Sequence, residues 1–151
     1  MTLAAQALAL RSAYPESRPR ISRALLSWSY SLKPSEGSSS YDIRLEAHPY
    51  RQAEIVVLSP MLQPDSQGRL PHVYDTGALC LNLAGDWRPN QLFINTTIPW
   101  TLEWLFFYEL WLSDGVWRGD GLAPGDRRGQ EAILHKYTVP YSGATGRGTG
   151  Y

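Results

Sequence analysis

The sequence has little or none of several features that usually indicate a function. It contains a single cysteine among 151 residues, which excludes an intrachain disulfide framework and a zinc site built from several cysteines. Its 14 basic and 14 acidic residues cancel, so long-range attraction to nucleic acid or anionic lipid is not expected. The most apolar run, residues 98–112, is interrupted by Glu103 and Glu109 and is too short to span a bilayer comfortably.

Signals for export and for metal binding are also scarce. No basic segment precedes the short apolar stretch at the N-terminus, so a secretory signal is not expected and we predict a cytoplasmic protein. The three histidines are scattered along the chain and lack the spacing of a metal site. We therefore expect neither a metal nor a cofactor.

The hydrophobic pattern predicts one α+β domain. With 43% hydrophobic and 19% charged residues, the composition suits a globular protein. Residues 2–14 are rich in alanine and leucine and indicate a helix that Thr2 caps. Residues 21–34 predict one strand, residues 41–47 alternate cleanly between apolar and polar side chains as in a half-buried strand, and residues 53–59 predict a more fully buried strand.

A long irregular segment separates these strands from a second helix. Residues 61–87 carry several prolines and glycines, which indicate a structured loop of the kind that often bears functional groups. A helix is expected over residues 98–112, with Thr96 or Thr97 near its cap. Aromatic residues at helical spacing predict an apolar face that packs in the core or against a partner: Trp100, Trp104, Phe107 and Trp111.

The C-terminal part completes a single domain. Residues 130–137 indicate a short helix, and residues 141–151 are Gly-rich and indicate a flexible tail. We therefore expect one domain over residues 1–140, in which helices pack on one antiparallel sheet of about four strands.

The single cysteine lies in the stretch LPHVYDTGALCL, residues 70–81. Taken alone, Cys80 is more readily explained as a small buried hydrophobic residue than as a reactive group. His72 stands eight positions before it, with a turn containing Gly77 between them, and His72 alone could be an ordinary loop histidine. Catalysis by Cys80 is favoured only when Leu81 and the Trp87-x-Pro89 motif are considered together with His72 and Gly77.

This stretch and its continuation resemble the active-site segment of ubiquitin-conjugating enzymes. That family has a His-Pro-Asn tripeptide, a Gly turn, a Cys-Leu pair and then a Trp-x-Pro motif. In this chain His72 stands in the place of the asparagine, and Cys80 in that of the cysteine. The other positions of the expected active-site loop are Pro71, Tyr74, Asp75, Gly77, Leu81, Trp87 and Pro89.

The resemblance implies a fold and a mechanism. The fold is UBC-like, with an N-terminal helix, an antiparallel sheet, a long active-site loop and a central helix. The mechanism is acyl transfer through a Cys80 thioester, which needs no strong base beside the thiol because the activated bond is delivered to it. His72 would stabilise the oxyanion as the asparagine does, and could deprotonate the acceptor. Asp114 lies near the place of an acceptor-orienting residue, although Ser-Asp-Gly is also an ordinary helix-ending turn.

Two departures narrow the resemblance. Leu70 replaces the motif histidine, and the histidine at position 72 is similar to the bacterial branch of the family, of the kind found in CBASS antiphage operons. Members of that branch are thought to attach the C-terminal glycine of a cGAS-like nucleotidyltransferase to a target or to process such a linkage. The resemblance implies such a nucleotidyltransferase as the partner protein.

Two other functions stay open at this level. A binding module of the same fold would use the sheet and the aromatic helix as its surface, and an exposed part of that helix would favour a homo-oligomer. A cysteine hydrolase that processes a C-terminal linkage would need His72 as a base, ion-paired with the thiol.

Overall fold

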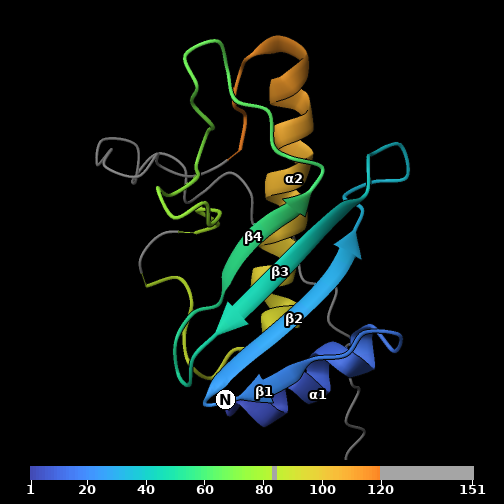
Figure 1. Cartoon of the computed structure of the whole chain (residues 1–151), viewed down its shortest axis with the longest axis vertical. Helices are drawn as coiled ribbons and strands as arrows, with labels where there is room; N and C mark the ends of the chain where they lie inside the picture. The colour runs from blue at the N-terminus through green and yellow to red at the C-terminus, as the bar shows by residue number, and fades with distance from the viewer. Residues whose placement is uncertain (83–84, 120–151) are drawn as a thin grey trace, which may run out of the picture.

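The computed structural model describes residues 1–82 and 85–119. Four strands of this part form one antiparallel sheet in the order β1-β2-β3-β4, and α2 runs behind that sheet in Figure 1. The predicted α+β architecture is therefore confirmed, while the expected short helix and Gly-rich tail lie outside the described residues. In chain order the elements are α1 (Leu3–Ala13), β1 (Arg20–Ser22), β2 (Leu25–Leu32), β3 (Tyr41–Ala47), β4 (Glu54–Ser59), the 3-10 turn η1 (Phe93–Asn95) and α2 (Thr97–Asp114).

Helix α1 begins and packs as its sequence predicts. The Thr2 hydroxyl accepts a hydrogen bond from the Ala5 N–H at 3.2 Å, which caps the first turn. Leu3 and Leu10 are buried and belong to the hydrophobic core. Gln6 is also buried, and its amide reaches across to the segment that enters η1.

The prediction of one strand over residues 21–34 is wrong, because the chain turns back at Arg23 and Ala24. Both residues have positive φ, 49° and 60°, as a two-residue hairpin turn requires. Arg20 pairs with Ser27, so β1 and β2 form a short antiparallel hairpin. The sequence does not predict this turn because it contains none of the Gly, Asn or Asp residues that usually adopt this conformation.

Strand β3 confirms its predicted alternation, whereas β4 is less buried than expected. Four alternate side chains of β3, from Tyr41 to Ala47, are buried, and those between them face solvent or its boundary. In β4 only Ile55 is fully buried, and Leu58 is 47% exposed. The reason is position, since β4 pairs with β3 on one side and lies at the edge of the sheet.

Helix α2 is longer than predicted and buries a different face. It ends at Asp114, followed by Gly115 in the left-handed conformation with φ 74°. Asp114 therefore lies in the last helical turn and not in the loop beyond it. Of the four aromatic residues predicted to form the apolar face, Trp104 is buried, while Trp100, Phe107 and Trp111 are half-buried at its margins. The buried side chains of α2 are Thr97, Ile98, Thr101, Trp104, Leu105 and Tyr108.

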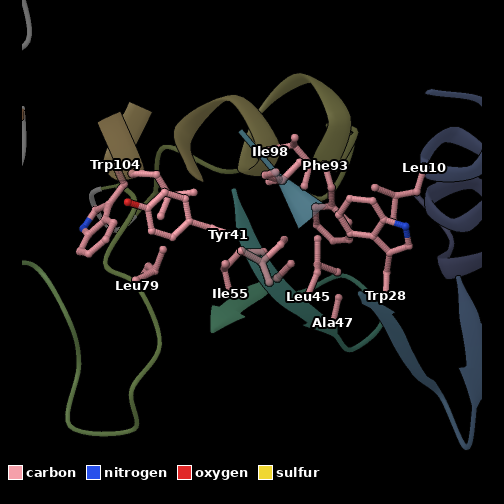
Figure 2. Close-up of a cluster of buried hydrophobic side chains, with 14 of the residues drawn as sticks. Leu10, Trp28, Tyr41, Leu45, Ala47, Ile55, Leu79, Phe93, Ile98 and Trp104 are labelled. Carbon is pink, nitrogen blue, oxygen red and sulfur yellow. The ribbon is translucent and has the colours of Figure 1, made fainter. Parts of the chain in front are cut away.

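The hydrophobic core lies between α2 and the facing side of the sheet (Figure 2). Trp28 and Leu45 contribute from the sheet, Ile98 and Trp104 from α2, and Phe93 from η1. Burying such side chains stabilises the fold by roughly 1.5–3 kcal/mol each. No helix in the described ranges is long and apolar enough to cross a membrane.

Candidate active site

Cys80 lies on one arm of a small antiparallel hairpin that spans His72 to Cys80. The Cys80 N–H donates to the His72 carbonyl at 2.8 Å, and the Tyr74 N–H donates to the Ala78 carbonyl at 2.9 Å. Gly77 closes the turn with φ 83°, and its N–H donates to the Tyr74 carbonyl at 2.8 Å. The predicted turn between histidine and cysteine is therefore a hydrogen-bonded hairpin, although no strand was expected there.

One face of the hairpin anchors it to the sheet. Val73 and Leu79 form its central pair, and Leu79 is buried in the core cluster (Figure 2). The Leu79 N–H donates to the Ile55 carbonyl at 2.8 Å, which ties the hairpin to the outer edge of β4. The cysteine therefore belongs to a segment that is fixed by both a backbone hydrogen bond and core packing.

The other face of the hairpin carries the thiol. Because side chains alternate along paired strands, Tyr74 and Cys80 share the face opposite Leu79 and are diagonal neighbours, within reach of a long aromatic side chain. Cys80 is a free thiol at intermediate burial, and Tyr74 is exposed. A side-chain hydrogen bond with Cys80 raises the pKa of Tyr74 to about 12, with burial and the charge of the thiolate acting in the same direction.

The backbone carbonyl of His72 accepts the hydrogen bond from Cys80, and its imidazole ring contacts Trp117. It has φ 52°, a conformation in which histidine, asparagine and aspartate are enriched. Its side chain is buried and stacks on Trp117, with 5.1 Å between ring centroids. Trp117 also packs against Trp104 of α2, so the histidine joins the hairpin to the segment that follows the helix.

Trp117 is a site residue that the sequence did not single out. Its ring contacts His72, Trp104 and Phe107, and it lies 37 positions beyond Cys80 in the chain. The local sequence offered one signal, an isolated tryptophan after the helix-ending glycine, but its partner across the fold could not be inferred from spacing.

Asp114 is held in an ion pair at the end of α2. Its carboxylate lies 2.5 Å from a guanidinium nitrogen of Arg118 and accepts the Val116 N–H at 2.9 Å. The hydrogen bond with Arg118 and that with Val116 lower the pKa of Asp114. These contacts connect Asp114 to its own turn, whereas the contact between this region and the hairpin runs through Trp117 and His72.

Most of the remaining residues of the predicted active-site loop make packing or backbone contacts that hold the loop in place. Trp87 is half-buried and stacks on Phe93, with 5.8 Å between ring centroids, and Leu81 packs against the core. The Pro89 carbonyl accepts a hydrogen bond from the N-terminal amine of Met1. Pro71 is half-buried, and Asp75 is exposed in the hairpin turn.

An amide pair flanks the site on the far side of the cysteine. The side chains of Gln52 and Asn82 exchange hydrogen bonds, which link the loop before β4 to the chain two residues beyond Cys80. Residues 1–82 and 85–119 bring no three His, Cys, Asp or Glu side chains into a group that could hold a metal ion. The arrangement presents a free, half-buried thiol on a hairpin that is anchored to the sheet.

Comparison with protein families gives a match that covers most of the chain. The family model E2-CBASS, described as Type II CBASS E2 protein, matches residues 6–124, a range that includes the whole hairpin and α2. No curated protein matches the chain.

Proposed function

The chain belongs to the type II CBASS E2 family, and on that premise we propose that Cys80 carries a partner protein as a thioester and transfers it to an amine. The family gives the chain an E2-like role in CBASS antiphage defence. The acyl group in our proposal is the C-terminus of a cGAS-like nucleotidyltransferase. The fold we propose is the UBC fold, in one catalytic domain over residues 1–140.

The observation that carries the proposal is the placement of the thiol. Cys80 is free, half-buried and fixed by its backbone hydrogen bond to His72, on a hairpin anchored at Ile55. A thioester carrier needs a sulfur that a large partner can reach and that does not move when loaded. An unperturbed thiol suffices for such exchange, since about a few per cent of it is thiolate at neutral pH.

His72 and Asp114 have supporting roles in this proposal. The imidazole of His72 donates a hydrogen bond toward the oxyanion, in the place that an asparagine amide fills in ubiquitin-conjugating enzymes. Asp114 stays ionised because the Arg118 guanidinium lowers its pKa, so it is a poor proton acceptor. We propose that its negative charge helps to orient the incoming amine.

The test is the intact mass of the protein under non-reducing conditions, after expression with its operon neighbours. The wild type is compared with Cys80→Ala and with Cys80→Ser, which can trap the acyl group as a more stable ester. We expect a thiol-labile adduct on the wild type, a hydroxide-labile adduct on the serine variant and none on the alanine variant. The mass of the adduct identifies the carried protein.

Other outcomes separate the competing functions. Absence of an adduct on all three forms, with phage protection intact in Cys80→Ala, would contradict the carrier mechanism and favour a non-catalytic binding module. Release of the partner's C-terminus without any trapped adduct on the serine variant would favour a cysteine hydrolase. Repeating the expression without each operon neighbour in turn shows whether a separate activating enzyme is required.

A further inference from the structure

The indole ring of Trp117 contacts both the hairpin that carries Cys80 and helix α2. It stacks on the His72 imidazole, with 5.1 Å between the ring centroids and 27° between the ring planes. It also contacts Trp104 and Phe107 of α2, at centroid distances of 5.5 Å and 6.3 Å. Because Trp104 is 4% exposed and belongs to the core, the indole connects the His72 ring to the interior of the molecule.

The turn that carries Trp117 is itself fixed. The Asp114 carboxylate accepts the Val116 N–H at 2.9 Å and pairs with Arg118, so it holds the residues on either side of Trp117. Gly119 packs on the indole so closely that a Cβ atom at this position would lie 2.8 Å from the ring. The indole N–H is buried and makes no hydrogen bond within the part of the chain that the structure describes, so ring contacts hold this side chain.

We infer that Trp117 is a positioning residue, which holds the His72 imidazole in the orientation that the proposed discharge of Cys80 requires. The inference rests on the proposed function and deepens it, since it names what orients the ring that donates toward the oxyanion. The His72 carbonyl accepts the Cys80 N–H at 2.8 Å, but this bond does not set the torsion angles of the side chain. Stacking on an indole that is packed against the core selects one orientation, so the donor is in place before the oxyanion forms.

The expected size of the effect follows from the strength of a stacked aromatic pair. Such a pair favours one arrangement by roughly two- to tenfold. Leucine in place of the indole fills part of the space but has no ring to stack on the imidazole, so His72 populates the productive orientation less often and discharge slows. Phenylalanine keeps a stacking ring and loses no polar contact, because the indole N–H of Trp117 makes no hydrogen bond in the described residues.

The test is the discharge of acetylated Cys80 on the purified full-length chain. The thiol is acetylated with p-nitrophenyl acetate, discharged with hydroxylamine at neutral pH and followed by intact mass. We expect Trp117→Leu to slow discharge roughly three- to tenfold, and Trp117→Phe to stay within about twofold of the wild-type rate. In a His72→Ala background, Trp117→Leu should slow discharge no further, because both changes act through the same imidazole.

The position of the imidazole has its own measurement. A stacked indole shifts the proton resonances of the ring beneath it upfield, so the C–H signals of His72 report the contact by NMR, with exposed His48 as the reference. We expect this shift to vanish in Trp117→Leu and to persist, at reduced size, in Trp117→Phe. Gly119→Ala is a milder variant whose methyl group presses on the indole, so the His72 signals should move and discharge should slow by less than in Trp117→Leu.

The controls keep the test specific. Trp100→Leu is the same chemical change at a half-buried residue in the first turn of α2, whereas Trp117 follows the last turn. Its discharge rate and its His72 signals should equal those of the wild type. Cys80→Ala measures acetylation at other groups, and thermal unfolding of each variant shows whether the fold is retained.

Three results would overturn the assignment. The first is a wild-type discharge rate for Trp117→Leu or for His72→Ala. The second is equal slowing by Trp117→Leu in the wild-type and His72→Ala backgrounds, because the indole would then act through the fold and not through the imidazole. If Trp117→Leu does not fold, Gly119→Ala decides, and the third result is displaced His72 signals without slower discharge. Absence of an adduct in cells contradicts only the carrier mechanism, since none of these measurements needs the partner protein.

Discussion

His72 combines a left-handed backbone, a carbonyl that holds Cys80 and a ring stacked on Trp117. Only the ring depends strongly on the identity of the residue, since asparagine tolerates the same backbone conformation. The role of the imidazole can therefore be separated from that of the backbone by substitution.

We predict that His72→Asn discharges a loaded Cys80 within about threefold of the wild-type rate, because an amide also donates a hydrogen bond to an oxyanion, whereas His72→Ala loses roughly tenfold or more. Single-turnover discharge to a primary amine measures both, and thermal unfolding controls for the lost stack on Trp117. If the asparagine variant is as slow as the alanine variant, His72 transfers a proton.

The turn between β1 and β2 places two non-glycine residues, Arg23 and Ala24, in the left-handed region. Ala24 has φ 60°, where a side chain is unfavourable and glycine is not. We predict that Ala24→Gly raises the free energy of unfolding by about 0.5–1 kcal/mol, measured by urea denaturation. Ala9→Gly is the matched control, because the same change inside α1 should destabilise by about 1 kcal/mol. Destabilisation by both changes would show that the turn is not strained.

At the scale of elements, α1 is joined to η1 by one buried amide. The Gln6 side chain donates to the Gln91 carbonyl at 2.8 Å and accepts the Phe93 N–H at 2.9 Å. Its burial was not predicted, because glutamine on a helix usually faces water and its two backbone partners lie 85 and 87 positions away.

We predict that Gln6→Ala lowers the free energy of unfolding by about 2–4 kcal/mol, since it leaves the buried Phe93 N–H and the half-buried Gln91 carbonyl without their partner. Gln67→Ala is the control, because that residue is exposed and uses its backbone N–H for its hydrogen bond to Asp65. Urea denaturation of both variants checks the difference. Equal stability of the two would mean that water replaces the Gln6 amide without cost.

The elements also show what a sequence can and cannot predict. Local signals predicted α1 with its Thr2 cap and the alternation of β3, because capping and burial of one strand face depend on neighbouring residues. The turn at Ala24 has no residue typical of a turn, so the sequence predicts a single strand where the structure has β1 and β2. The low burial of β4 follows from its place at the sheet edge, which alternation within one strand does not reveal.

The site was predictable in the same limited sense. Spacing along the chain brought His72, Gly77 and Cys80 into one segment, and the structure places them in one hairpin. The shared position of Tyr74 and Cys80 on the two arms of one hairpin follows from its register, which the sequence did not predict for a segment expected to be irregular. Trp117 reaches the site only through tertiary packing.

At the scale of the whole molecule, the tyrosines make stability dependent on alkaline pH. Burial raises the pKa of Tyr41 above its ordinary value of 10.0, and the hydrogen bond with Glu109 adds to this shift. Burial raises the pKa of Tyr14 and Tyr108 as well. The folded state thus holds these protons more tightly than the unfolded chain, so their contribution is complete below pH 10 and is lost as pH rises above it.

We predict that the free energy of unfolding falls progressively above about pH 10, measured by urea denaturation at a series of pH values. Tyr41→Phe should make this decline shallower, because phenylalanine has no proton to lose. Tyr50→Phe is the control, since Tyr50 is 66% exposed and should leave the slope unchanged. A decline of the same steepness in Tyr41→Phe would exclude this residue as a source of the pH dependence.

The single cysteine also determines how the protein responds to oxidants. Oxidation of Cys80 would give a sulfenic acid, which is normally rescued when a second thiol condenses with it to form a disulfide. The sequence contains no other cysteine, so no resolving thiol exists within the chain. Recovery must therefore come from an external thiol such as glutathione, and in its absence further oxidation to the sulfinic acid is irreversible and ends the chemistry at this hairpin.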